Sequence, residues 1–193
     1  MKFITIFAAF ILCLCMICSF IPSQSDMQIY TDTVRLHVIA ESDDSADQLI
    51  KLSVRNEVVE YLSELSENAQ SAEETIKIIN DNIDDIRRVA DRALEKLDSD
   101  AKAEVVLSNE YYPTRSCENV RLPAGTYTSL KIKIGKAQGH NWWCVLYPQL
   151  SRGSTSVDDT LIRTGFSSDQ IEILTGSEKI KYKLRFKILE IFG

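Results

Sequence analysis

Two neighbouring stretches decide the fold: Leu130-Lys131-Ile132-Lys133-Ile134-Gly135 and Gly139-His140-Asn141-Trp142-Trp143-Cys144-Val145-Leu146-Tyr147-Pro148. In the first stretch apolar and charged residues alternate, which is typical of a half-buried strand. The second contains both tryptophans of the chain, and its apolar run from Trp142 to Tyr147 predicts another strand. Because only residues 135–139 separate the two strands, we expect them to form a hairpin.

Two further strands are predicted from the same alternation. The segment Val34-Arg35-Leu36-His37-Val38 predicts a strand with one buried face, and Arg35 and His37 share its other side. Residues 103–107 alternate as well and predict a strand that runs toward Tyr111. Residues 113–125 contain two prolines and a glycine, so we expect a loop there.

Helices are predicted between these strands. Ser45 with Gln48 and Ser71 with Glu74 have the spacing of capping boxes, so a helix is expected to begin at each serine. An apolar stripe continues to Leu65 in the first helix and to about Leu97 in the second. The predicted fold is therefore α+β: an antiparallel or mixed sheet covered on one face by a long two-helix hairpin.

The C-terminal part is less regular. Residues 151–159 are expected to form an exposed loop, and 161–174 one or two short helices. Residues 179–188 alternate strictly, which predicts a strand with one apolar and one cationic face; a terminal helix is the alternative. The apolar positions are Ile180, Tyr182, Leu184, Phe186 and Ile188, and the cations are Lys179, Lys181, Lys183, Arg185 and Lys187.

The N-terminal segment predicts export. Lys2 is the only charge among the first 25 residues, and an apolar run follows from Phe3 to Ile21. A basic start and an apolar run indicate a signal peptide over residues 1–25, with cleavage after Ser25. The run approaches the ~20 residues that span a bilayer, so an uncleaved anchor is the alternative. Residues 26–193 are expected to form a single secreted domain outside the membrane.

Charge is distributed unevenly along this domain. Residues 41–104 contain 18 acidic and 8 basic residues, whereas 110–152 contain 2 acidic and 6 basic ones. The net charge of the whole chain is −6, which disfavours nucleic acid as a partner. Acidic and basic regions of this kind suit docking to a protein or internal pairing.

Cys144 and His140 suggest one catalytic reading, a thiol nucleophile with its base. Positions four apart on a strand lie roughly 13 Å from each other, so this pair needs a bend. We favour a Cys144 that is buried beside aromatic rings or bridged to Cys117, since two cysteines outside the cell can form one disulfide.

The remaining polar and aromatic residues could form a metal site or a docking surface, or could have structural roles. His37 and His140 lack a closely spaced third ligand, so structural histidines are favoured over a metal site. Helix capping explains the acidic residues after Glu41 as well as cation binding does. Trp142 and Trp143 should point in opposite directions on a strand, one into the core and one outward, where a tryptophan can anchor an interface. No phosphate-binding glycine loop or serine elbow occurs.

Several segments resemble the stage II sporulation protein R family. They are Leu36 to Asp43, Lys51 to Arg55, Leu122 to Tyr127, Leu130 to Gly135, Gly139 to Pro148 and Arg185 to Glu190. The resemblance implies a protein made in the forespore and secreted into the space between the two membranes of the developing spore. There it implies activation of a membrane-bound aspartic protease of the mother cell, which cleaves the precursor of the early mother-cell sigma factor.

One position departs from the family's pattern. Where the family has a second Cys in a Pro-Leu-Cys pattern, this chain has Gln149-Leu150-Ser151. The short bridge that the family pattern implies cannot form here, so Cys117 pairs with Cys144 or Cys144 stays a thiol.

The first hypothesis is therefore a secreted, non-enzymatic activator without cofactor or metal. Its partner-binding residues are expected to be Arg35, His37, His140, Asn141, Trp142 and Trp143. A secreted thiol hydrolase that uses Cys144 and His140 is the second hypothesis, and a passive binding module of the wall zone is the third.

Overall fold

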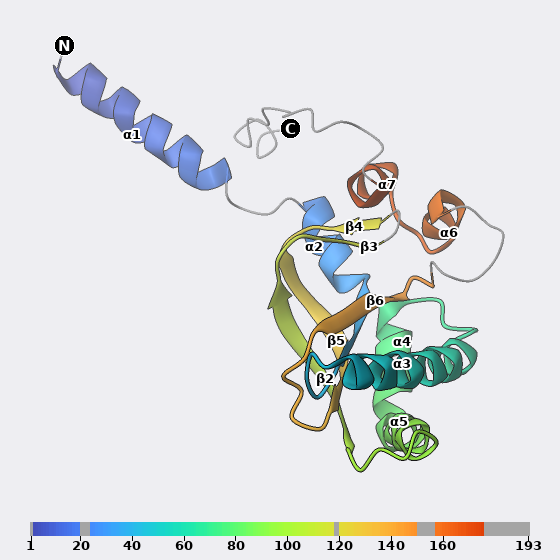
Figure 1. Cartoon of the computed structure of the whole chain (residues 1–193). Coiled ribbons are helices and arrows are strands. Elements are labelled where there is room, and N and C mark those ends of the chain that lie inside the picture. Colours follow the sequence, from blue (N-terminus) through green and yellow to red (C-terminus); the bar gives the residue numbers. More distant parts are fainter. Residues whose placement is uncertain (1, 20–23, 118–119, 150–156, 176–193) are drawn as a thin grey trace.

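A four-stranded mixed sheet forms the centre of the computed structural model (Figure 1), which describes residues 2–19, 24–117, 120–149 and 157–175. Its strands are β1 (Val34–Ile39), β2 (Ala103–Tyr112), β5 (Gly125–Ile134) and β6 (Asn141–Tyr147), in the order β2-β5-β1-β6. β1 runs parallel to β5, and the other two pairings are antiparallel. The four predicted strands of this sheet and its mixed pairing are thus confirmed.

The expected hairpin of β5 and β6 is wrong, because β1 lies between them. Leu36 stands opposite Leu130 of β5 on one side and opposite Cys144 of β6 on the other. A central strand is covered on both faces, and β1 is buried at every position from Val34 to Val38. The expectation of a single buried face for this strand is therefore also wrong.

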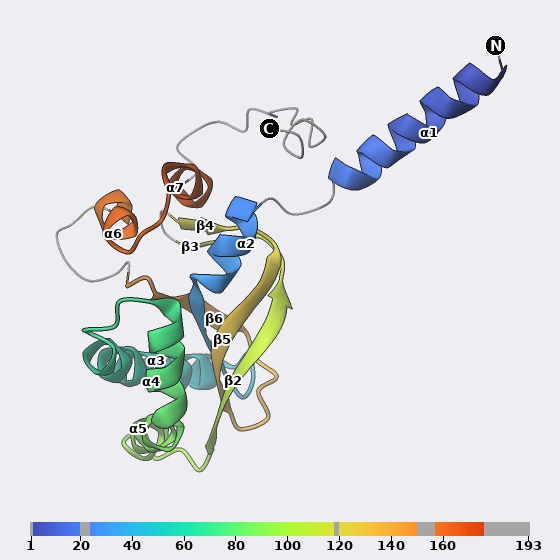
Figure 2. The same cartoon turned by 180° about the vertical axis from the view of Figure 1, so that it is seen from behind.

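Three helices pack on one face of the sheet: α3 (Ser45–Leu65), α4 (Ala72–Asp81) and α5 (Ile83–Glu95), as Figure 2 shows. Their apolar side chains and those of Leu36, Leu130 and Ile132 form the main core. The second predicted helix is two helices, because the backbone leaves helical geometry at Asn82, with φ −120° and ψ 18°. The two-helix hairpin is replaced by a three-helix layer.

A second layer covers one end of the opposite sheet face. It comprises α2 (Gln24–Thr31), the hairpin of β3 (Arg115–Cys117) and β4 (Val120–Leu122), α6 (Val157–Arg163) and α7 (Ser168–Thr175). Its buried residues are Ile29, Val120, Leu122, Tyr127, Leu161, Phe166 and Leu174. Two short helices after residue 157 agree with the sequence, whereas the loop expected at 113–125 contains the β3–β4 hairpin.

The helix starts follow the sequence only in part. Ser71 Oγ accepts from the Glu74 amide at 3.1 Å, as its capping box predicts. The helix at Ser45 begins as predicted, but Asp44 is its N-cap and makes no capping bond. Gln48 instead donates to the backbone oxygen of Ser42 at 2.8 Å, because the chain turns back on itself before the helix.

The structure describes most of the N-terminal segment but not the last residues of the chain. Residues 2–19 form α1, which extends away from the sheet (Figure 1). Within the described part of the chain, none of the helices combines the length and apolarity that a membrane crossing requires. The signal peptide at 1–25 and the domain at 26–193 stay predictions. The predicted strand at 179–188 and most of the predicted loop at 151–159 lie outside the described residues.

Candidate interaction site

A buried arginine is the centre of the second sheet face. Arg35 has no exposed surface, and its guanidinium carbon lies 4.2 Å from the ring centre of Tyr112, 5.1 Å from Tyr127 and 4.6 Å from Trp143. Aromatic faces attract a cation, so the three rings stabilise the charge without a carboxylate. Arg35 Nε and Nη1 have no hydrogen-bond acceptor among the described residues. Burial lowers the pKa of Arg35.

His37 lies beside this arginine on the same strand face. Its ring stacks on Tyr112 with centroids 4.5 Å apart and planes 12° apart. Nδ1 lies 2.6 Å from the amide nitrogen of Asn141, which can only donate, so Nδ1 accepts and Nε2 carries the proton. Burial, and then the nearby charge of Arg35, lower the pKa of His37 to about 4. The imidazole is therefore neutral at neutral pH.

Polar residues of β2 and β5 form the rim of this cluster. Glu110 makes an ion pair with Lys131 and accepts from Ser108 Oγ at 3.0 Å. The hydrogen bond from Lys131 is the main reason that the pKa of Glu110 is lowered. Tyr112 bonds Ser129 through their hydroxyls at 2.8 Å. The polar side chains at the rim of the cluster are thus paired with one another.

A second polar group occupies the corner where β6 begins. Asp43 Oδ1 accepts from the His140 backbone amide at 2.6 Å and lies 2.5 Å from His140 Nδ1. Lys51, which is 6% exposed, reaches the His140 carbonyl at 3.1 Å. Gly139 is required here because a Cβ on it would lie 2.1 Å from the Ser42 carbonyl oxygen. The corner fixes the backbone of His140 but leaves the His140 side chain 80% exposed.

The remaining residues of the Trp-Trp-Cys block divide between the two faces of the sheet. Trp142 and Cys144 pack against the main core, and the Arg55 guanidinium carbon lies 4.9 Å from the Trp142 ring centre. Trp143 packs against the second layer instead. The expected alternation of the two tryptophans is confirmed. Both are half-buried, and an interface role for either of them stays a prediction.

Comparison with known proteins places these residues in a family. The family model described as stage II sporulation protein R matches residues 30–156, which include the buried arginine cluster and the corner. This chain belongs to the stage II sporulation protein R family. No solved structure matches it.

One relative is the stage II sporulation protein R of Bacillus subtilis (strain 168). It is 32% identical over 117 residues, which are 61% of this chain and 52% of that protein. The matched part is thus about half the length of the relative. The resemblance seen in the sequence is therefore correct at the level of the family.

Within this family member, the structure sorts the predicted partner-binding residues into three places. Arg35, His37, Asn141 and Trp143 meet on one sheet face, Trp142 lies on the other, and His140 lies at the corner. Arg35 and His37 are 0% and 2% exposed, so neither side chain forms the surface that the sequence suggested. Whether any of the six contacts a partner stays a prediction.

The sequence suggested three pairs among the cysteines and histidines: Cys144 with His140, His37 with His140, and Cys117 with Cys144. His140 is bonded to Asp43, whereas Cys144 packs against the apolar core, so the structure assembles no thiol–imidazole pair from them. His37 and His140 have different partners, and the described residues include no cluster of three metal-ligating side chains. The Cys117 side chain lies outside the described residues, so the Cys117–Cys144 bridge stays a prediction.

Two residues central to the cluster, Tyr112 and Tyr127, were missed in the sequence. The alternation of residues 130–134, extended backward along β5, places Tyr127 on the same face as Ser129 and Lys131. The face on which Tyr127 lies could therefore be predicted from the sequence. The position of Tyr112 beside His37 could not, because it depends on the order of β2, β5 and β1.

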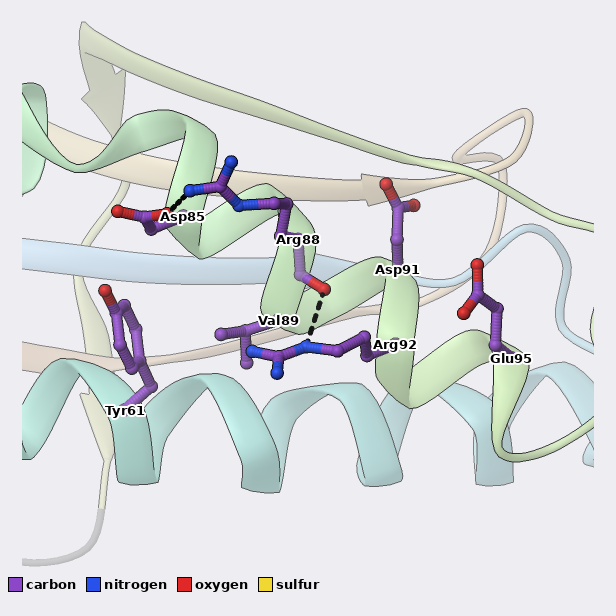
Figure 3. Close-up of a pocket in the computed structure, with 7 residues that line it drawn as sticks. All are labelled: Tyr61, Asp85, Arg88, Val89, Asp91, Arg92 and Glu95. Carbon is purple, nitrogen blue, oxygen red and sulfur yellow. Dashed lines mark hydrogen bonds and ion pairs between the residues drawn. The ribbon is translucent and has the colours of Figure 1, made fainter.

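A polar groove of about 620 Å³ lies elsewhere, between α3 and α5 (Figure 3). Tyr61 and Val89 form its apolar part, and the remaining lining residues are charged: Asp85, Arg88, Asp91, Arg92 and Glu95. Arg88 pairs with Asp85, and Arg92 Nε donates to the Arg88 carbonyl at 3.3 Å. Asp91 accepts from the Ala103 amide at 2.9 Å. These contacts join α5 to itself and to β2 and indicate no catalytic arrangement.

Proposed function

We propose that this chain is a secreted signalling protein of endospore formation that activates a membrane-bound aspartic protease of the mother cell. Activation leads to processing of the precursor of the early mother-cell sigma factor. The proposal places the protein in the space between forespore and mother cell, after export through residues 1–25. Family membership over residues 30–156 is the observation that carries it.

The arrangement of the polar side chains supports a protein that acts by binding a partner. The polar side chains that sequence analysis offered for chemistry are used within the fold, in the Arg35 cluster and in the Asp43–His140 corner. His140 and Asn141 are exposed and stand beside the half-buried Trp142. We therefore place the protease contact at this corner, defined by Asp43, His140 and Asn141.

No observation favours the thiol hydrolase. Cys144 packs against the apolar residues of the main core, and a thiol in apolar surroundings is usually an inert structural residue. Labelling with iodoacetamide at neutral pH distinguishes the two functions. We expect slow labelling of Cys144 in reduced, folded protein, whereas rapid labelling that is lost in His140→Ala would favour the hydrolase.

The direct test uses sporulating cells that lack the gene and carry a wild-type or variant copy. We expect wild type and Cys144→Ala to restore cleavage of the sigma-factor precursor, measured by immunoblot. His140→Ala combined with Asn141→Ala should reduce cleavage. Arg87→Ala is the matched control, because Arg87 is a half-exposed residue on α5 at the surface outside the corner.

Two results would contradict the proposal at different levels. Normal cleavage without the gene would remove the signalling function itself and favour a passive wall-zone module. Full activity of the double variant, with secreted protein at the wild-type level, would remove only the corner as the contact surface. Addition of purified protein to vesicles that contain the protease then tests direct activation.

A further inference from the structure

Asn141 links the surface of the protein to its interior. The residue is exposed at the start of β6, yet its side-chain nitrogen lies 2.6 Å from Nδ1 of the buried His37. In the sheet, His37 stands opposite Trp143, and Asn141 stands opposite Ile39, so the two side chains meet diagonally across β1 and β6. Diagonal neighbours on antiparallel strands lie within reach of each other. The strand register therefore builds this hydrogen bond, which connects the corner to the buried Arg35 cluster.

This bond determines which end of the Asn141 amide a partner meets. An asparagine side chain has a donor end, the NH2 group, and an acceptor end, the carbonyl oxygen. His37 Nδ1 accepts from the donor end. Oδ1 of Asn141 makes no hydrogen bond within the part of the chain that the structure describes, and the residue is exposed. The corner thus offers a hydrogen-bond acceptor at this position.

The surroundings of His37 maintain this arrangement. The imidazole stacks on Tyr112, which fixes the orientation of the ring. Burial, followed by the charge of Arg35, lowers the pKa of His37 to about 4, so the ring stays neutral and one of its nitrogens stays an acceptor. A protonated ring would have an N–H group at both nitrogens, and Nδ1 could no longer accept from Asn141.

We propose that His37 determines the specificity of the contact corner by orienting the Asn141 amide, so that the partner must supply a hydrogen-bond donor at this point. His37 touches no partner itself and is a positioning residue that acts through Asn141. The inference rests on the proposed contact at the corner of Asp43, His140 and Asn141. A partner with an acceptor at this point would leave two buried acceptors unpaired, and such a penalty is what makes hydrogen bonds selective.

The other two side chains of the corner have the same polarity. The Asp43 carboxylate is 55% exposed and can only accept. Its Oδ1 lies 2.5 Å from His140 Nδ1, so Nδ1 carries a proton, and a neutral His140 ring then offers Nε2 as another acceptor. Lys51 is buried and donates to Gln48 and to the His140 carbonyl, so it brings no donor to the surface. Three acceptors on one surface suit a donor-rich side chain of the partner, and an arginine guanidinium with its five N–H groups fits best.

Nitrogen-15 NMR of the histidine rings tests the first step without a partner. We expect His37 in the wild-type full chain, kept in detergent solution, to carry its proton on Nε2 at neutral pH. A carboxylate cannot donate, so Asn141→Asp should move the proton to Nδ1 and raise the pKa of His37 by roughly one pH unit, since a nearby negative charge favours the imidazolium. Asn80→Asp, at an exposed position of α4, is the matched control and should leave His37 unchanged. A wild-type His37 with its proton on Nδ1 overturns the inference.

Cleavage of the sigma-factor precursor in sporulating cells tests the polarity of the contact. Asn141→Lys replaces the acceptor by donors and should reduce cleavage about fivefold or more, because it leaves the partner's donor unpaired. Asn141→Asp keeps an acceptor at the surface and should reduce cleavage less. Asn80→Lys is the matched control for the added charge. An equal loss in the aspartate and lysine variants at position 141, with equal levels of secreted protein, overturns the requirement for a donor on the partner.

A double variant tests whether His37 acts through Asn141. His37→Phe keeps a ring on Tyr112 but removes the acceptor, and we expect it to lower cleavage. In an Asn141→Ala background the same change should cause no further loss, because the amide that His37 orients is absent. Additive losses would identify His37 as a merely structural residue and overturn the inference. If cells without the gene cleave the precursor normally, the proposed function itself is wrong; if they require the gene and the losses add, only this inference is wrong.

Discussion

Arg35 shows how one residue defines the character of a whole sheet face. Its charge is buried among three rings and has no carboxylate partner among the described residues. Such a charge is costly to desolvate, and an apolar residue of similar length often replaces it without loss of stability. Its presence is therefore better explained by the specific packing of Tyr112, Tyr127 and Trp143 than by a gain in stability.

Two substitutions at Arg35 test this explanation. We expect Arg35→Met to leave the free energy of unfolding within about 1 kcal/mol of wild type, because the apolar chain needs no hydrogen bonds. Arg35→Lys should lower it by roughly 2 kcal/mol, since a compact ammonium cannot lie flat on several rings. Urea denaturation measures both values. A larger loss in Arg35→Met than in Arg35→Lys would show that the charge itself stabilises the fold.

The neighbouring His37 predicts a pH dependence of stability. The unfolded imidazole has a pKa near 6.5, whereas the pKa in the folded protein is about 4. Between these values the unfolded chain binds a proton that the folded chain does not, so stability is lost as the pH falls. We expect a loss of about 3 kcal/mol from pH 7 to pH 4 from this group.

Denaturation of wild type and His37→Gln across this pH range isolates the effect. The glutamine variant should show a shallower decline below pH 6.5, because the group that titrates there is absent. Parallel pH curves for the two proteins would contradict the lowered pKa of His37.

At the scale of elements, β1 and the corner connect the parts of the fold. The segment after β1 holds the start of β6 in place: Gln138 and Gly139 each donate to it, reaching the carbonyls of Glu41 and Ala40 at 3.0 Å. Asp43 completes the contact through His140. The corner thus fixes the position of β6, which has no hairpin turn of its own to hold it against β1.

Removal of the Asp43 carboxylate should weaken this connection. We expect Asp43→Ala to lower the melting temperature and to speed amide exchange in β6, because the His140 amide loses its acceptor. Asp44→Ala is a close control, since Asp44 makes no side-chain capping bond. Equal effects of the two variants in calorimetry would indicate a general helix-dipole effect and not the corner contact.

At the scale of the whole molecule, the sheet separates two cores of unequal size. The helical layer buries most of the apolar residues, and the second layer is a smaller cluster. Trp142 reports on the first core and Trp143 on the second. A smaller cluster with fewer apolar contacts is expected to open at a lower free energy than the main core.

Single-tryptophan variants test this order. We expect the fluorescence of Trp143 in Trp142→Phe to change at lower urea concentration than that of Trp142 in Trp143→Phe. Circular dichroism provides the reference transition for each protein. Coincident midpoints after correction for the stability of each variant would show that the two cores unfold as one unit.

The sequence by itself determined the strands β1, β2, β5 and β6, the start of α3, the cap of α4 and the family. These features depend on periodicity and short-range contacts, which a linear pattern records directly. Only the tertiary structure decided that β1 separates β5 from β6, that Arg35 and His37 are buried, and that Tyr112 joins them. Strand order is set by packing between segments distant in the chain, and burial of a face depends on which layer covers it. The Trp-Trp-Cys block is therefore recognisable from its letters alone, but its division between two cores follows from the third dimension.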